Sequence, residues 1–542
     1  MSIAWSEHLI VAPVLIPLVC GALQVPIKHA RHELKNVLSM LSVLGLIAVA
    51  GTLVILTDSG HWQDGMGIYL AANWKAPFGI ALLADRLAAI MLLLTALLAA
   101  AALLYSSLRW SRVGVHFHPL FQFLIMGLNG AFLTHDLFNL FVFFEVMLAA
   151  SYGLLLHGYN ANRLRSGMQY IAVNLVASLL FLIGVALIYA GSGTLNMADL
   201  ASRIAAMSAT DLALVKLAVT VLAIAFLIKS AMWPLGFWLP STYAAASPPV
   251  AAMLVLMTKV GAYVILRLWL LVFPSDAGAA AGFGLEALLY GGMATIVFGA
   301  AGMFASEAPG RLAGYGAIVS SGTLLAVIGY GQPSLITAGL YYLLGSTVAI
   351  AAYVLLIELI ERIRAPGAAV LAVTMEAFAI EDAPEPPVGV GIPAALAFLG
   401  LSFVACALII AGLPPLSGFV AKFGLFHALL NPESAEHAVG PVTWILLALI
   451  IVSGLATIIS MMRFGVRAFW VPSVVIPPRL QATEVAPVSL LLLVCVAMTV
   501  AAGPIFAYLK RTSVEIHQPA LYMQRVLSAP TVPNPRHEAD RR

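Results

Sequence analysis

The feature that most limits the fold of this sequence is a series of apolar runs, each about twenty residues long, that follow one another along the chain. A helix of about 20 apolar residues crosses the hydrocarbon core of a membrane. Of the 542 residues, 62% are hydrophobic and 9% are charged, whereas soluble domains have roughly 25% charged residues. The runs are continuous rather than alternating, which argues against a transmembrane β-barrel. The sequence therefore predicts an all-α polytopic membrane protein, not a soluble enzyme, a fibrous protein or a disordered chain.

About fourteen runs are long enough to span a membrane, with ends placed only to within several residues. They lie near residues 8–27, 36–57, 82–105, 118–134, 136–157, 167–190, 212–231, 249–273, 284–304, 311–329, 334–360, 393–430 with a break after 411, 442–463 and 485–508. The first run has no basic segment before it and no small-residue cleavage site, so we expect a retained helix rather than a signal peptide. The polar segment at about 364–393 is expected to be a partly disordered linker on the inside.

The Lys and Arg residues of the short loops predict the orientation of the chain. With the N-terminus outside, the outside loops carry only Lys75 and Arg203. The inside loops then carry thirteen basic residues: Lys28, Arg31, Lys35, Arg109, Arg112, Arg163, Arg165, Arg311, Arg362, Arg364, Arg463, Arg467 and Arg479. The basic residues after position 509 do not fit this orientation, because with the N-terminus outside they would also lie outside. Since tails are weaker evidence than short loops, we expect both termini outside.

Two of the runs are interrupted. The stretch SAMWPLGFWLPSTYAAASPP follows Lys229, and LPPLSGF follows Gly412. Proline removes a backbone donor and glycine tolerates unusual torsions, so both stretches should break their helices. Broken backbone persists at membrane depth only where protein or water satisfies it. The interrupted runs are the seventh and the twelfth, and their odd separation gives them opposite orientations, which predicts two inverted repeats of five helices.

This count predicts the division of the chain. A three-helix segment, 1–117, is followed by a first five-helix repeat, 118–273, and a second, 284–463, which includes the linker 364–393. A last helix, 485–508, and a polar tail, 509–542, complete the chain.

Four ionisable side chains lie within the runs, where a charge is costly and function is the default interpretation. Glu145 lies about nine residues into its run, about 14 Å deep at 1.5 Å per residue. Lys229 directly precedes the first break, Lys259 lies deep in the eighth run, and Lys422 follows the second break. The alternatives are structural: a carboxylate satisfied by a neighbouring helix, or lysines that extend to the membrane surface.

A carboxylate and buried lysines together are suited to moving protons. Burial lowers the pKa of a lysine, and a nearby carboxylate raises it again. A partner that moves toward or away from the amine can therefore switch it between holding and releasing a proton. The four residues predict a proton relay that needs no cofactor and no metal. Cys20, Cys406 and Cys495 form no ligand spacing, so no haem, zinc or iron–sulfur site is expected.

Other ionisable residues are weaker candidates. Asp85 and Arg86 are adjacent at the start of the third run and are expected to anchor it or to pair locally, and Arg267 lies within reach of the outer surface. His427, five residues after Lys422, is the one histidine that could join a relay. The remaining candidates lie near span ends or in loops, where solvation or an interfacial position is the better interpretation: Lys216, Glu286, Glu358, His116, His118, His135 and His157.

The segments around the four buried charges resemble the antiporter-like subunits shared by respiratory complex I, membrane-bound hydrogenases and the multi-subunit Mrp cation/proton antiporters. They are FFEVMLAASY, KSAMWPLGFWLPSTYAAASPPVAAMLVLMTKVGAY and GLPPLSGFVAKF. The segment NWKAPFGIALLADRLAAIMLLLTALL is similar to the D subunits of the Mrp antiporters in particular. The resemblance implies fourteen helices with two inverted repeats. It also implies Glu145 as an ion-pair carboxylate, Lys229 as its partner, Lys259 as the bridging lysine and Lys422 as the lysine of the second broken helix.

The sequence departs from this family in the eleventh run. Many members carry histidine there, whereas this chain reads LYYLLGSTVAIAAYVLL, with Gly345 near the corresponding place. The link between the two halves is then expected to use water or hydroxyls such as those of Ser346 and Thr347.

We therefore expect a secondary transporter subunit, rather than an enzyme, in the bacterial inner membrane. It would use the proton gradient to export Na⁺ or K⁺, with other subunits of a hetero-oligomeric antiporter complex, protons, monovalent cations and membrane lipid as partners. The net charge of +3 gives no reason to expect nucleic acid. The alternative is a proton-pumping membrane subunit of a complex I-like NADH:quinone oxidoreductase or of a membrane-bound hydrogenase. An inactive scaffold is disfavoured, because apolar residues in place of the buried charges would stabilise it.

Overall fold

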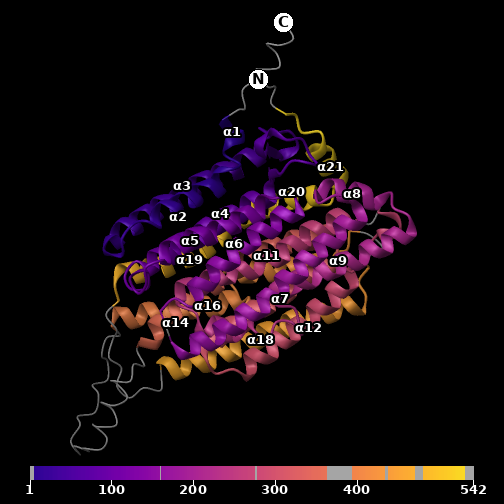
Figure 1. Cartoon of the computed structure of the whole chain (residues 1–542). Helices are drawn as coiled ribbons and strands as arrows, with labels where there is room; N and C mark the ends of the chain where they lie inside the picture. Colours follow the sequence, from indigo (N-terminus) through magenta and orange to yellow (C-terminus); the bar gives the residue numbers. More distant parts are fainter. Residues whose placement is uncertain are drawn as a thin grey trace, which may run out of the picture.

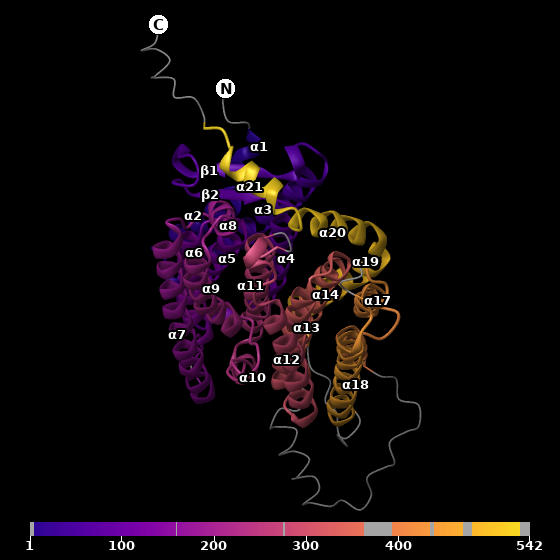
Figure 2. The ribbon, with the colours of Figure 1, turned by 90° about the vertical axis from the view of Figure 1, so that its right-hand side faces the viewer.

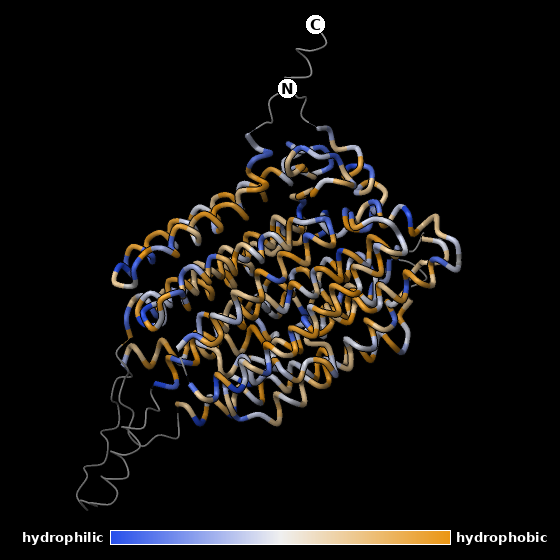
Figure 3. The backbone as a smooth tube through the Cα atoms, viewed as in Figure 1, coloured by the Kyte–Doolittle hydropathy of each residue, from blue (hydrophilic) through white to orange (hydrophobic). Residues whose placement is uncertain are grey.

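The structure is a bundle of long helices that lie side by side (Figure 1). This computed structural model describes residues 5–158, 160–274, 277–362, 393–433, 438–469 and 480–531. Within these ranges, 12 helices are long and apolar enough to cross a membrane, and three shorter apolar helices accompany them. Hydrophobic residues cover the lengths of the helices, and hydrophilic residues gather at their ends (Figure 3). The prediction of an all-α polytopic membrane protein is confirmed, while the number of fourteen spans and the inverted repeats stay predictions.

The first half of the chain supplies the helices α1 to α11. They are α1 (Trp5–His8), α2 (Ala12–Gln24), α3 (His32–Asp58), α4 (Arg86–Ser106), α5 (Phe117–Leu133), α6 (Leu137–Leu155), α7 (Ala161–Ser192), α8 (Met197–Ala205), α9 (Ala209–Lys229), α10 (Leu239–Ala245) and α11 (Pro248–Val272). Two short antiparallel strands, β1 (Gly67–Leu70) and β2 (Ala81–Ala84), pair between α3 and α4 with Gly67 opposite Ala84.

The second half supplies the remaining helices. They are α12 (Leu285–Ala305), α13 (Pro309–Tyr330), α14 (Pro333–Glu361), α16 (Ala394–Ala411), α17 (Ser417–Leu430), α18 (Pro441–Phe469), α19 (Ala482–Val500), α20 (Ala502–Ile516) and α21 (Pro519–Leu527). Single turns of 3₁₀ helix lie at His29–Arg31, Gln63–Gly65, Ala71–Asn73, Trp110–Arg112 and Gly278–Ala280.

The centre of the bundle is formed by α11, α13 and α14. These helices are apolar on every side, as expected of helices that are surrounded by protein. In α11 the most apolar stretch is 100% buried, and in α13 and α14 it is 94% and 89% buried. Each of the three begins with proline, which is pre-organised for the first turn of a helix and whose missing N–H is not needed there.

The two ends of the bundle differ in what they carry. The strands, α1, α8, α20 and α21 lie at one end, which we call the upper end because it is at the top of Figure 2. There Arg511 of α20 pairs with Asp58, and Arg525 of α21 pairs with Asp64. Carboxylates at the upper end therefore neutralise basic residues of the segment after position 509. This is the segment whose charges did not fit the orientation predicted from the loops.

Both predicted helix breaks are present. The first lies between Lys229, where α9 ends, and Leu239, where α10 begins. The second follows Ala411, the last residue of α16, and Gly412 adopts a left-handed conformation with φ of 80° before α17 begins at Ser417. Glycine adopts this conformation without the steric cost that other residues incur.

The last predicted span is wrong at its C-terminal end. We expected one helix over 485–508, but α19 ends at Val500, and α20 lies across the upper end rather than along the bundle (Figure 2). The Tyr508 hydroxyl donates to the carbonyl of Arg86 at 2.9 Å, and the Ser513 hydroxyl donates to the carbonyl of Pro333 at 2.8 Å. These bonds fasten α20 to the first turns of α4 and α14. The expected linker at 364–393 lies almost wholly outside the described residues, and the division of the chain into repeats stays a prediction.

Candidate functional site

Glu145 lies near the middle of α6, at the border between its buried side and its outer face. The carboxylate of Asp136 caps this helix and accepts the N–H groups of Phe138 and Asn139 at 3.0 and 2.8 Å. The exposed residues of α6 around Glu145 include Phe138, Val142 and Ala149, which recur at the period of one helix face. Glu145 itself is partly buried, and its Oε1 atom is buried with no hydrogen-bond partner among the described residues. The carboxylate is therefore available to a further donor.

Lys229 is the last residue of α9 and is buried, with 7% of its surface exposed. Its ammonium donates to the side-chain oxygen of Asn174 on α7. The Asn174 amide donates in turn to the carbonyl of Tyr170 at 2.7 Å, which fixes the orientation of its oxygen. Glu145 is close enough to act electrostatically on Lys229, but no ion pair joins the two within the described chain. The amine is thus held by a neutral acceptor near a carboxylate, rather than locked to it.

A small cavity adjoins Lys229. Its volume of about 10 Å³ is at the lower limit for a single water molecule. Asn174, Tyr170 and Thr258 line it together with the lysine. Thr258 belongs to α11 and is adjacent in the sequence to Lys259, so the cavity connects the first broken helix to the helix that carries the second lysine.

Lys259 is fully buried in α11, and its partners are hydroxyl groups. Its ammonium donates to Ser320 Oγ of α13 at 2.7 Å, and Ser320 Oγ lies 2.8 Å from Ser346 Oγ of α14. Three central helices are therefore joined by one chain of hydrogen bonds. The Thr347 hydroxyl instead donates to the carbonyl of Leu343 in its own helix at 2.6 Å, so it does not take part.

Ser320 is a candidate site residue that sequence reasoning missed. It stands in the segment AIVSSGTLL, which has no charge or motif to mark it. Its position opposite Lys259 depends on how α13 packs against α11, and that packing leaves no local pattern in the sequence.

Lys422 is held by the backbone that the second break exposes. Its ammonium donates to the carbonyl of Ala411 at 2.7 Å and lies 3.5 Å from the carbonyl of Ile450 on α18. Because α16 ends at Ala411, this carbonyl is one of the groups left without a helical partner, and the negative end of the helix dipole favours a cation there. A Cβ atom at Gly454 would lie 2.7 Å from the ammonium nitrogen, so only glycine lets α18 approach this closely.

A polar cavity lies between Ser346 and Lys422. Its volume is about 20 Å³, enough for a water molecule. Its polar lining consists of Tyr342, Ser346, Lys422, Ser453 and Thr457. The hydrogen-bonded chain from Lys259 therefore reaches the cavity that contains Lys422, whereas the cavity beside Lys229 reaches Thr258, the neighbour of Lys259 in the sequence.

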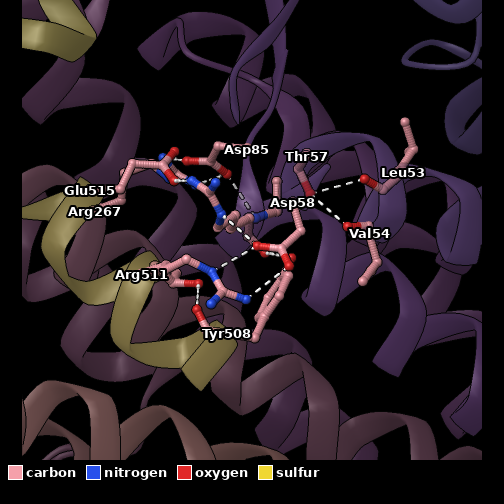
Figure 4. A network of polar contacts seen from close by, with 12 residues as sticks. Leu53, Val54, Thr57, Asp58, Asp85, Arg267, Tyr508, Arg511 and Glu515 are labelled. Carbon is pink, nitrogen blue, oxygen red and sulfur yellow. Dashed lines mark hydrogen bonds and ion pairs between the residues drawn. The ribbon is translucent and has the colours of Figure 1, made fainter. Parts of the chain in front are cut away.

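Two expectations for the other charged residues are wrong, and a third is right in part. Asp85 anchors α4 by accepting the N–H of Ala88 at 2.8 Å, but its ion pair is not local: it pairs with Arg267 of α11, through two bonds of 2.6 and 2.8 Å (Figure 4). Arg267 is 7% exposed and so does not extend to the outer surface. Glu358, expected to be solvated, is bonded to protein at the lower end, where the Tyr105 hydroxyl and the Trp110 indole N–H each donate to it at 3.0 Å.

The histidines divide into buried and peripheral ones. His118 and His135 are buried rather than interfacial, with ring nitrogens 3.1 Å from Ser39 Oγ and 3.0 Å from the carbonyl of Leu133. In both rings the other nitrogen, Nε2, is buried and has no partner among the described residues. His427 lines a larger groove between α14, α17 and α20, whereas Lys422 lines the cavity beside Ser346, so the two are not brought together.

The comparisons with known proteins agree with this arrangement. Residues 134–373 match the family model described as NADH:quinone oxidoreductase/Mrp antiporter, TM. The chain is 52% identical to the D subunit of a probable K⁺/H⁺ antiporter from Rhizobium meliloti (strain 1021), over 97% of this chain and 98% of the relative. It is 33% identical to the D subunit of a Na⁺/H⁺ antiporter from Alkalihalophilus pseudofirmus, over 96% of this chain and 99% of the relative.

Solved structures show the same fold. A chain of the Mrp complex from Dietzia sp. DQ12-45-1b superposes with a TM-score of 0.82 at 25% identity, over 97% of this chain and 100% of that chain. A chain of respiratory complex I from Thermus thermophilus gives a TM-score of 0.71 at 22% identity, over 96% and 100% of the two chains, a likeness of fold alone. The chain therefore belongs to the D-subunit family of the Mrp-type monovalent cation/proton antiporters, within the wider family that includes the membrane subunits of complex I.

Proposed function

We propose that this chain carries protons through the bacterial inner membrane as the D subunit of a multi-subunit Na⁺/H⁺ or K⁺/H⁺ antiporter. Glu145, Lys229, Lys259 and Lys422 are the proton-carrying side chains. The observation that carries the proposal is the set of uncharged polar partners and small cavities that lie beside the three buried lysines inside an otherwise apolar bundle. The names of the relatives, which specify K⁺/H⁺ in one case and Na⁺/H⁺ in another, support monovalent cation exchange.

The partners of the lysines suit proton transfer. Lys229, Lys259 and Lys422 donate to an amide oxygen, a hydroxyl and a backbone carbonyl, respectively. None of these acceptors carries a charge, so each amine can lose its proton without leaving a carboxylate unpaired. A carboxylate partner would instead hold the ammonium permanently charged.

The central step uses hydroxyl groups. A hydroxyl has one donor hydrogen and two acceptor lone pairs. Ser320 can therefore accept a proton from Lys259 while its own proton passes to Ser346. From Ser346 the proton reaches Lys422 through a water molecule in the intervening cavity, which is lined by the hydroxyls of Ser453 and Thr457.

The position of Glu145 supports assembly with other subunits. A carboxylate at mid-membrane depth is costly when it faces lipid. Because Glu145 lies beside the exposed face of α6, a neighbouring subunit must cover this face for the carboxylate to stay ionised. The antiporter complex of the proposed function supplies such a neighbour.

A complex I-like proton pump is the second candidate, and the likeness of fold to a chain of Thermus complex I is what supports it. Purification of the complex separates the two functions. Small membrane subunits without redox centres support the antiporter, whereas quinone-binding or iron–sulfur partners support the pump.

The proposal is tested by transport in membrane vesicles that contain the whole complex. Lys229→Ala and Glu145→Gln are expected to abolish the dissipation of a pH gradient on addition of Na⁺ or K⁺, with the complex still assembled. Lys216→Ala is the matched control, because Lys216 is on the same helix as Lys229 but is partly exposed and donates to the Ala279 carbonyl at 2.8 Å. Activity of Lys229→Ala at the level of this control would overturn the role of Lys229.

A further inference from the structure

Six charged side chains form a second cluster at the upper end, apart from the relay (Figure 4). They come from four helices that are distant in the sequence. They are Asp58 of α3, Asp85 and Arg86 at the start of α4, Arg267 of α11, and Arg511 and Glu515 of α20. The relay uses none of them.

In two of the three carboxylates of this cluster, both oxygens accept hydrogen bonds. Asp85 accepts two bonds from Arg267, at 2.6 and 2.8 Å, and one from the N–H of Ala88 at 2.8 Å. Asp58 accepts two bonds from Arg511, at 2.9 and 2.8 Å, and one from Arg86 at 3.2 Å. Both groups are thus held as structural carboxylates.

Glu515 is different. Arg86 donates to its Oε2 atom at 2.8 Å, but Oε1 is buried and has no hydrogen-bond partner among the described residues. The residue as a whole is 8% exposed. A buried carboxylate oxygen without a donor is costly when ionised, and protonation removes this cost.

Glu515 lines a small cavity. A water molecule in this cavity would be the acceptor of the proton that Glu515 releases. The volume of the cavity is about 20 Å³, enough for one water molecule. Asp85, Arg267 and Tyr522 line it together with Glu515, and the rest of its lining is apolar. Two carboxylates that share one cavity repel each other when both are ionised.

The charges around Glu515 shift its pKa in opposite directions. Burial and the neighbouring Asp85 raise the pKa of Glu515 to about 8, while Arg86 and Arg267 oppose this shift. The titratable and charged groups that surround it come from every element packed against it: Asp58, Asp85, Arg86, His135, Tyr263, Arg267, Tyr508, Arg511, His517 and Tyr522.

We infer that Glu515 is a second proton-binding site of this chain, which exchanges its proton at the upper end and, when protonated, holds α20 against α4 and α11. Proton binding at Glu515 can be measured without transport, so this site stands apart from the proposed relay. Proton binding at Glu515 would then control how firmly α20 is docked on the helix bundle.

The direction of the effect follows from linkage. A carboxyl on an undocked, hydrated α20 has its ordinary pKa, whereas the docked group has a raised one. The docked state therefore binds the proton more tightly, and docking is fully stabilised below the ordinary pKa of the carboxyl, weakens as the pH rises from there to about 8 and levels off above it.

The charged cluster around Glu515 includes a residue of α11, the helix that carries Lys259. Arg267 lies eight residues after Lys259 on α11, which is about 12 Å along the helix axis at 1.5 Å per residue. Loss of the proton at Glu515 therefore changes the electrostatic environment of the upper end of α11.

The experiment is hydrogen exchange on the purified complex, with the protection of α20 measured against pH and corrected for the intrinsic exchange rate. In the wild type, protection of α20 is expected to fall as the pH rises toward about 8 and to level off above it, with α14 unchanged. Glu515→Gln, which imitates the protonated form in size and charge, is expected to keep α20 protected across this range. Glu433→Gln is the matched control, because Glu433 is an exposed carboxylate at the same end, and it should behave as wild type.

Infrared difference spectroscopy of the same samples supplies the second measurement. A protonated carboxyl band that titrates near pH 8 and is absent from Glu515→Gln supports the site. A wild type without this band, or a Glu515→Gln variant whose α20 loses protection as the wild type does, would overturn it. Both results are independent of whether the four relay residues carry protons.

Discussion

At the scale of single residues, the arginines of the charged cluster and the lysines of the proposed relay differ in their partners. Arg86, Arg267 and Arg511 are bonded to carboxylates. The buried lysines of the relay are bonded to neutral oxygens. Arginine stays protonated and matches the two oxygens of a carboxylate, whereas lysine changes its protonation state readily when buried. The arginines are therefore suited to structure and the lysines to proton transfer.

Replacement of Ser320 tests the hydroxyl link. Ser320→Ala removes the acceptor of the Lys259 ammonium and is expected to lower antiport by at least about tenfold, because a positioned proton-transfer group contributes this much or more. Ser321→Ala is the control, since Ser321 is adjacent and buried but its hydroxyl has no partner among the described residues. The measurement is the initial rate of cation-dependent proton movement in vesicles. Equal rates in the two variants would exclude Ser320 from the pathway.

The Asp85–Arg267 pair is expected to act on stability. Arg267→Met leaves the buried Asp85 carboxylate without its partner and should destabilise the protein by about 3–5 kcal/mol. The double variant with Asp85→Asn should recover part of this loss, because the uncompensated charge is gone. The midpoint of thermal unfolding of the purified complex measures both effects. A single variant as stable as wild type would contradict the pairing.

At the scale of helices, the breaks were predictable and the packing around them was not. Proline and glycine mark both breaks in the sequence, and the charged residues beside them could be identified from depth alone. The bond from Lys422 to the Ala411 carbonyl depends on how α17 folds back beside the end of α16. The division of α19 from α20 was missed, although Gly503 and Pro504 mark the first turn of α20, because the apolar run continues across them.

Close packing at Gly454 leads to a prediction for α18. In Gly454→Ala the new methyl group would lie 2.7 Å from both the Lys422 ammonium and the Ala411 carbonyl oxygen, so the bond between them must shift. Antiport is expected to fall by about tenfold or more, with assembly retained. Gly400→Ala in α16 is the control, because a Cβ atom there meets nothing within 4 Å. A Gly454→Ala variant with full transport would show that the position of Lys422 is not critical.

At the scale of the whole molecule, the four proposed relay residues lie on α6, α9, α11 and α17, while the charged cluster joins α20 to α3 and α4 at the upper end. The sequence predicted the polytopic fold and the four buried charges, because apolar run length and depth are local properties. It could not predict pairs such as Asp85 with Arg267 or Arg86 with Glu515, which are 182 and 429 residues apart. Such pairs follow from tertiary packing, for which no local spacing exists. Ser346 contacts Ser320, whereas Thr347 is bonded within its own helix, and the connection between the halves stays a prediction.

The most direct test of the relay is proton flux through the complete complex in proteoliposomes when Lys259 is replaced by methionine, a side chain of similar length without charge. Lys259 is fully buried and donates to the Ser320 hydroxyl of α13, which lies within hydrogen-bond distance of the Ser346 hydroxyl of α14. We predict that proton flux driven by a Na⁺ or K⁺ gradient falls to the level of liposomes without protein, while the complex remains assembled. Flux equal to that of the wild type would contradict a proton pathway through the centre of this chain.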